Sequence, residues 1–163
     1  MEQRPRRKPT RLSSFNYNEA GTYFLTLCTK DKHCIFGQVL DGTDETQSPM
    51  MQLSRVGMIV QNQIQTMADF YPNVNVDRFV VMPNHIHLLL SIRGDEKETT
   101  PANAVVPGFI STLKRFTNKQ AGADLWQRSF HDHVVRNEQD YLRIWQYIDS
   151  NAVKWKKDCF YTA

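Results

Sequence analysis

The sequence predicts an α+β fold, in which an antiparallel sheet carries helices packed on it. Segments rich in aromatic and β-branched residues alternate with segments whose apolar residues recur at helical spacing. Their order, β-β-α-β-β-α-β-α, is typical of such a fold. With 163 residues, 40% of them hydrophobic and 23% charged, the chain suits a single globular domain with a hydrophobic core.

The first half of the chain is expected to hold two strands and a helix. Segments 21–29 (GTYFLTLCT) and 34–40 (CIFGQVL) have the composition of strands, and the polar segment 41–49 is predicted to be a loop. An amphipathic helix is then predicted from five apolar residues spaced three or four apart: Leu53, Val56, Val60, Ile64 and Met67.

The second half is expected to add three strands and two helices. Strands are predicted at 75–82, 85–92 and 126–135, with a turn at Pro83-Asn84. A charged loop over 93–103 leads to a helix marked by Phe109, Leu113 and Phe116. The last helix is predicted to run from its N-cap, Asn137, to about Lys156.

Charge and cysteine content limit the class of protein. A net charge of +3 permits a polyanionic partner without requiring one. Three cysteines without C-x-x-C spacing argue against a disulfide framework or a zinc ribbon. The sequence shows no secretory signal and no apolar run of membrane length, so we expect a cytoplasmic protein that does not bind membranes.

The N-terminus is markedly basic. We expect residues 1–20 to form an arm in front of a single domain over 21–160. Such an arm is either a solubilising tail or a nucleic-acid-binding segment. Five of its first twelve residues are cationic: Arg4, Arg6, Arg7, Lys8 and Arg11.

The stretch VVMPNHIHLLL (80–90) places two histidines in an otherwise apolar strand. Because side chains alternate along a strand, His85 and His87 share one face. Two such imidazoles can bind one divalent metal, or they can lie hydrogen-bonded in the core. A second pair, His131 and His133, also predicts a shared face, which leaves open a four-histidine site or one that His133 merely lines.

The C-terminal helix provides a candidate nucleophile. Its apolar stripe is predicted to face the core, whereas Tyr147 is predicted on the opposite, polar side, with Asn151 one turn later. A tyrosine outside the stripe is commonly an ordinary surface residue. Here an amide that can ligate a metal and Lys154, which can bind phosphate, are expected beside it. The stripe consists of Tyr141, Ile144, Trp145, Ile148 and Ala152.

The combination of MPNHIH with a tyrosine helix after WQRSFHDH resembles the single-tyrosine HUH transposases of bacteria, and more narrowly the REP-associated tyrosine transposases. The resemblance runs from about Arg11 to Trp155. It implies a ferredoxin-like α+β domain. It also implies that His85 and His87 are metal ligands, that Tyr147 is the nucleophile and that Asn151 is the third ligand.

The resemblance further implies the chemistry. In that family a divalent metal, Mg or Mn, binds the scissile phosphate of single-stranded DNA. The tyrosine attacks, giving a 5′-phosphotyrosine and a free 3′-hydroxyl, and the reverse attack religates. The expected partner is single-stranded or hairpin DNA at the bacterial nucleoid, and the expected state is a monomer or a homodimer. The residues alone would favour Zn, Fe or Mn, because imidazole is a softer ligand than Mg prefers.

One motif departs from the family pattern. The relatives usually carry Asn-Pro after the tyrosine, whereas this chain carries Asn151-Ala152. Alanine would let the helix continue, so the angle of the tyrosine helix stays open. Tyr141 and Tyr71 are rival tyrosines, which we interpret as structural.

Basic and aromatic residues are expected to contact DNA. The arm resembles the segment that reads a short sequence beside a hairpin, and Lys114 and Arg115 are expected to contact phosphates. Phe15 or Tyr17 could stack on an unpaired base. Metal-bound phosphate, Lys154, Lys114 or a water could ease deprotonation of the tyrosine.

Two other functions stay open from the sequence. One is a non-catalytic DNA-hairpin-binding relative, and the other is a His-rich metal hydrolase without a covalent intermediate.

Overall fold

A four-stranded antiparallel sheet forms the centre of the protein. The computed structural model describes residues 21–93 and 105–162. The strands are β1 (Gly21–Cys28), β2 (Gly37–Leu40), β3 (Met50–Leu53), β4 (Val74–Val81), β5 (His85–Ile92) and β6 (His131–Val135). The helices are α1 (Arg55–Thr66), α2 (Val105–Ala121) and α3 (Glu138–Asp149).

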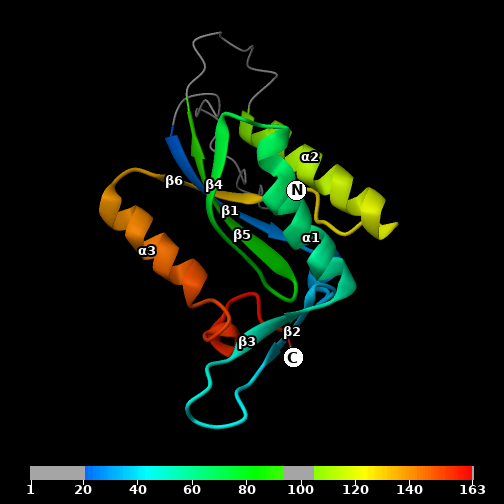
Figure 1. Cartoon of the computed structure of the whole chain (residues 1–163), viewed down its shortest axis with the longest axis vertical. Coiled ribbons are helices and arrows are strands. Elements are labelled where there is room, and N and C mark those ends of the chain that lie inside the picture. The colour runs from blue at the N-terminus through cyan, green and yellow to red at the C-terminus, as the bar shows by residue number, and fades with distance from the viewer. Residues whose placement is uncertain (1–20, 94–104, 163) are drawn as a thin grey trace, which may run out of the picture.

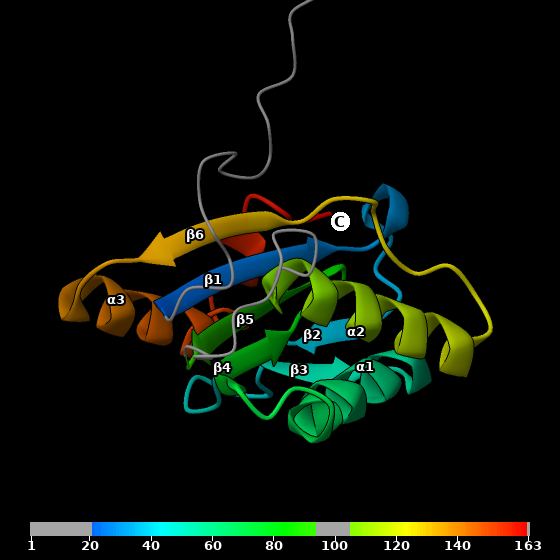
Figure 2. The same ribbon diagram turned by 90° about the horizontal axis from the view of Figure 1, so that it is seen from above.

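The sheet has the order β4-β5-β1-β6, and β2 pairs with β3 in a separate hairpin. Without that hairpin, the chain runs β1-α1-β4-β5-α2-β6, the connectivity of a ferredoxin-like fold. The α+β class and its ferredoxin-like antiparallel sheet are therefore confirmed. Helices α1 and α2 cover one face of the sheet and α3 covers the other (Figures 1 and 2).

Alternation along β5 divides its side chains between the two faces. Ile86, Leu88 and Leu90 join the main hydrophobic core with residues of α1 and α2. Leu89 packs instead against Ile144 and Ile148 of α3. The two histidines of β5 lie on the α3 side with Leu89, as the spacing predicted.

The first strand of the hairpin, β2, falls within the strand predicted at 34–40, but its partner β3 was not predicted. Leu53 ends β3 and does not belong to the helix. Helix α1 begins after Ser54, which has an extended backbone and whose Oγ accepts a hydrogen bond from the N–H of Gly57. The predicted helical stripe began one turn too early because a strand residue and the helix residues after it happen to share the apolar spacing.

The end of the chain also differs from the prediction. Asn137 is the N-cap of α3, as expected, but the helix ends at Asp149 and not near Lys156. Irregular turns and a 3-10 helix (Trp155–Lys157) follow. The helix therefore ends before residue 152, although this residue is alanine and not proline. The segment after the helix buries Asn151 and Trp155. The last strand starts at His131, and Trp126 forms only an isolated bridge with Thr29.

Part of the sequence lies outside the described residues, including the basic arm over 1–20 and the segment 94–104. The expected DNA contacts of Arg4, Arg6, Arg7, Lys8, Arg11, Phe15 and Tyr17 fall there. Among the helices that the structure does describe, none is both long enough and apolar enough to cross a membrane.

Candidate functional site

His85 and His87 are fully buried on the α3 side of β5, and their ring centroids are 4.6 Å apart. Each ring is held by a hydrogen bond at Nδ1. His85 Nδ1 lies 2.9 Å from Asn84 Oδ1, and His87 Nδ1 lies 2.8 Å from Thr26 Oγ1. The Asn84 amide nitrogen donates to two backbone carbonyls, so its oxygen is the acceptor for His85. His85 Nδ1 therefore carries the proton, and Nε2 presents a lone pair.

Three buried side-chain atoms lack a hydrogen-bond partner among the described residues: His85 Nε2, His87 Nε2 and Asn151 Oδ1. Buried polar atoms are nearly always paired, so three such atoms together require an explanation. Two imidazole nitrogens and an amide oxygen are a donor set that fits a divalent metal. These are the three residues that the sequence had suggested as ligands.

Asn151 belongs to the same cluster as the histidines. Its side chain lies close enough to His85 and Tyr147 to act on the pKa of both. The turn after α3 makes this arrangement, because it directs a residue one turn beyond Tyr147 into the protein.

Asp158 is a further neighbour that the sequence did not indicate. Ligand atoms of His85, His87 and Asp158 all lie within 4.8 Å of one another, which makes a second group able to hold a metal. The predicted helix to Lys156 hid this residue, since a continuous helix would have carried Asp158 away from the sheet. Asn84 and Thr26, which orient the rings, were missed because sequence spacing does not show hydrogen bonds between strands.

Burial keeps both imidazoles neutral. It lowers the pKa of His85 to about 4, although the charge of Asp158 and the side chain of Asn151 oppose this shift. Burial also lowers the pKa of His87 well below its usual range, and His85 adds to the effect. The neutral form is the one that binds a metal.

Tyr147 lies beside the histidines, on the rim of the site. Its ring centroid is 5.3 Å from that of His87 and 6.1 Å from that of Phe24, and the residue is 37% exposed. The prediction of an opposite, polar side was wrong. At about 100° per residue, Tyr147 is only about 60° around the helix from Ile144, so it adjoins the buried stripe.

The Tyr147 phenol is protonated at neutral pH. Burial raises its pKa and the charge of Asp158 raises it further, while a hydrogen bond from Asn151 acts in the opposite direction. Any attack by this oxygen would require groups that stabilise the phenolate. Lys154 and Lys157 line a cavity of about 360 Å³ together with Tyr147, Asn151 and Asp158.

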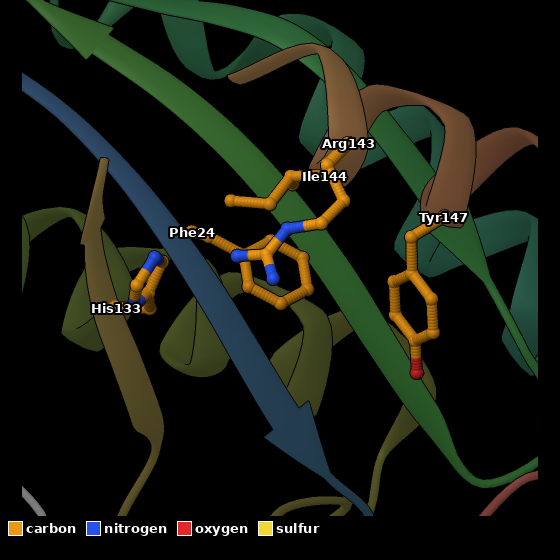
Figure 3. Close-up of a pocket in the computed structure, with 5 residues that line it drawn as sticks. All are labelled: Phe24, His133, Arg143, Ile144 and Tyr147. Atoms are coloured by element: carbon orange, nitrogen blue, oxygen red, sulfur yellow. The ribbon is translucent and has the colours of Figure 1, made fainter. Parts of the chain in front are cut away.

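A second cavity, of about 350 Å³, lies on another side of Tyr147 (Figure 3). It is lined by Phe24, His133, Arg143, Ile144 and Tyr147. The tyrosine thus forms a wall of both cavities.

The second histidine pair does not join the first. Strand β1 lies between β5 and β6 in the sheet, so it separates the two pairs. His133 donates a 2.6 Å hydrogen bond to Asp140 and lines the second cavity, while His131 is exposed. The four-histidine site considered from the sequence is not formed.

The rival tyrosines have structural partners. The hydroxyls of Tyr71 and Thr112 are hydrogen-bonded at 2.9 Å on the α2 side of the sheet. The Tyr141 hydroxyl donates to Asp77, and burial together with this carboxylate raises the pKa of Tyr141 to about 12.

Lys114 and Arg115 belong to α2 and Tyr147 to α3, and these two helices cover opposite faces of the sheet (Figure 2). Lys114 Nζ donates to the carbonyl of Gln127 at 2.6 Å. Lys114 therefore cannot help to deprotonate Tyr147, which corrects that expectation. Arg115 is exposed, and its guanidinium lies 5.2 Å from the ring centroid of Phe116.

Related proteins were found by sequence and by structure. A Haemophilus influenzae protein of no assigned function is 32% identical over 95% of this chain and 93% of its own length. A REP-associated tyrosine transposase of Escherichia coli is 29% identical over 50% of this chain and 47% of its own length. No protein-family model matches the chain.

The structure of a REP-associated tyrosine transposase bound to a REP hairpin has the same fold. It superposes with a TM-score of 0.58 at 19% identity, over 94% of this chain and 74% of that one. The chain is thus similar in sequence to proteins named REP-associated tyrosine transposases, and it has the fold of one of them.

Proposed function

We propose that this protein is a metal-dependent, single-stranded DNA endonuclease and strand transferase whose nucleophile is Tyr147. One observation carries the proposal: the tyrosine lies against His87, at a site where three buried ligand atoms have no partner among the described residues. The relatives are transposases, which supports a transposase-like function.

His85, His87 and Asn151 would hold a divalent ion, with Asp158 within reach of both imidazoles. When bound, the ion supplies Lewis-acid stabilisation of negative charge on a phosphate and helps to orient it. The amide and carboxylate oxygens are hard ligands, so they shift the preference of the site toward Mg or Mn.

In the proposed reaction Tyr147 Oη forms a bond to phosphorus, and the bond from phosphorus to the 3′ oxygen breaks. The phenol proton leaves to solvent, and the departing oxygen takes up a proton to become a free 3′-hydroxyl. The product is a 5′-phosphotyrosine. Because the covalent link keeps the energy of the phosphodiester, attack by a 3′-hydroxyl can reverse the step without ATP.

The surrounding residues would bind and position the strand. Lys154 and Lys157 bring positive charge to the cavity that contains Asp158, which offsets the carboxylate and favours a phosphate there. Phe24 and His87 contact the tyrosine ring and fix its direction. The hairpin in the related complex suggests that hairpin-bearing single strands are the substrate, with the basic arm as a further DNA contact.

The test is mass spectrometry of the protein mixed with a hairpin-bearing single strand and Mn²⁺. We expect a nucleotide adduct on Tyr147 that is lost in Tyr147→Phe and in His85→Ala. Tyr141→Phe is the matched control, because it changes a tyrosine of the same helix that hydrogen-bonds away from the site, and it should keep the adduct.

Two other outcomes would overturn the proposal. Absence of an adduct across a random pool of single strands, with binding intact, would indicate a non-catalytic DNA-binding protein. Cleavage that survives in Tyr147→Phe would indicate hydrolysis without a covalent intermediate. The second outcome has little structural support, because the two histidine pairs are separated by β1.

A further inference from the structure

We propose that the cavity beside Phe24 binds one unpaired nucleobase, that of a nucleotide adjoining the phosphate attacked by Tyr147. This inference rests on the proposed function and adds to it a subsite for the substrate. The cavity is lined by Phe24, His133, Arg143, Ile144 and Tyr147 (Figure 3).

The aromatic ring of Phe24 gives the cavity a surface on which a base can stack. Phe24 belongs to β1, and its ring meets Tyr147 edge-on, with an interplanar angle of 87°. It also contacts the ring of His87, at a centroid distance of 5.1 Å. A base on Phe24 would therefore lie next to both the nucleophile and a proposed metal ligand, as the base of an adjoining nucleotide must.

The rim of the cavity is polar and held in place. Asp140 accepts hydrogen bonds from both His133 and Arg143, so one carboxylate joins β6 to α3. The Asp140 side chain is 13% exposed, while those of Arg143 and His133 are 75% and 49% exposed. Figure 3 shows the guanidinium of Arg143 reaching from α3 to the front of Phe24. A planar cation there can stack on a base or donate to its edge.

The position of Tyr147 explains why the occupant would be a base. On one side the tyrosine borders the cavity that contains Asn151, Lys154 and Lys157, where the phosphate is proposed to bind. On the other it borders the Phe24 cavity, whose aromatic surface, arginine and histidine suit a base better than a second phosphate. A paired base cannot enter such a cavity without leaving its stack, so the cavity would also favour single strands.

The first experiment removes the base and leaves the backbone intact. Hairpin-bearing strands with one abasic site, placed in turn at each position around the cleaved phosphate, are compared with the intact strand for the rate of adduct formation. We expect one position, adjoining that phosphate, at which loss of the base slows the wild-type protein roughly tenfold.

The Phe24→Leu variant then tests the assignment to this cavity. The ratio of intact to abasic rates at that position should fall close to one, because the base has lost its stacking surface. A general slowing from altered contact with His87 does not change this ratio. Phe70→Leu is the matched control, since Phe70 is exposed and packs on Phe116 of α2, and it should keep the tenfold ratio. Tolerance of abasic sites at every position, or an unchanged ratio in Phe24→Leu, would overturn the proposal.

A second experiment does not depend on cleavage. Tyr147→Phe keeps the cavity wall but cannot form an adduct, and strands carrying 5-iodouracil at single positions can be photocrosslinked to it. We expect a crosslink to Phe24 or His133 from one position. Crosslinks confined to other parts of the chain would overturn the base subsite even if Tyr147 proves to be the nucleophile. A crosslink in the cavity without any Tyr147 adduct in the wild type would retain the subsite and reject the proposed function.

Discussion

The two faces of the central sheet are built differently, although the same strands form both. The face under α1 and α2 carries a large hydrophobic cluster, and its buried polar side chains, Gln63 and Thr117, have hydrogen-bond partners. The face under α3 has a cluster whose buried members are Leu89, Ile144 and Ile148, beside the buried polar site. All the described side-chain atoms that are buried without a partner lie on the α3 side. We infer that one face supplies stability, which allows the other to keep polar groups unpaired for binding.

Adjacent leucines of β5 give the largest expected effect. Leu88 and Leu89 are both 0% exposed, but they point to opposite faces. We expect Leu88→Ala to lower the free energy of unfolding by about 4 to 5 kcal/mol and Leu89→Ala by about 2 to 3, because the smaller cluster can collapse more easily around the lost volume. Urea denaturation of both variants measures the difference.

The order of the two leucine variants should reverse when formation of the Tyr147 adduct is measured. Leu89→Ala would slow formation of the Tyr147 adduct, because it loosens the support of α3, while Leu88→Ala would slow it less in the folded protein. Equal losses of stability in the two variants would show that the faces do not differ as proposed.

Asn151→Ala tests whether the α3 face serves metal binding and not stability. We expect a loss of more than 100-fold in Mn²⁺ affinity, by analogy with the large effects of altering metal sites. The metal-free protein should keep its free energy of unfolding within about 1 kcal/mol, since the substitution removes a buried oxygen that has no partner. Calorimetric titration with Mn²⁺ and urea denaturation in EDTA give the two values.

A matched control for this variant is Asn75→Ala, at an exposed position on β4, which should keep the Mn²⁺ affinity. A metal-free Asn151→Ala protein destabilised by several kcal/mol would mean that the asparagine is structural.

The two faces of the sheet also differ in how many of their residues could be predicted from the sequence. Apolar alternation in β5 and the N-cap Asn137 predicted the core face and the start of α3, because both are local patterns. The pairing of His85 with His87 followed from strand geometry alone. The sequence did not predict that Asp158 and Phe24 lie at the site. Asp158 reaches it through a chain reversal after α3, and Phe24 through strand pairing, and neither leaves a periodic pattern in the sequence. The predicted position of Tyr147 was wrong, although a helical wheel already places this residue about 60° from Ile144, beside the apolar stripe.

The buried histidines predict how metal-free stability changes with pH. The pKa of His85 is about 4 in the folded protein, whereas an unfolded histidine titrates near 6.5. Between these values the unfolded chain binds a proton that the folded chain does not, so the free energy of unfolding falls as pH falls. His85 alone should contribute a slope of about 1.4 kcal/mol per pH unit, and His87 adds to it.

Urea denaturation in EDTA between pH 7 and pH 4.5 measures this slope. The slope should be shallower in His85→Phe, because this variant lacks the buried imidazole. If the free energy of unfolding depends on pH equally in the wild type and in His85→Phe, other groups control stability in acid.

Substitution of one lysine on each face is expected to have the smallest effect, a change in DNA binding for one lysine and in stability for the other. Lys154 lines the cavity beside Tyr147, whereas Lys114 donates to the carbonyl of Gln127 from α2. We expect Lys154→Gln to weaken binding of a hairpin-bearing single strand a few-fold and to reduce the slope of log affinity against log salt by about 0.7 to 1, the value for one phosphate contact. Lys114→Gln should leave that slope unchanged and lower the free energy of unfolding instead. If Lys114→Gln reduces the slope as much as Lys154→Gln does, DNA also contacts the α2 face, and the division of the sheet into a stabilising face and a binding face is wrong.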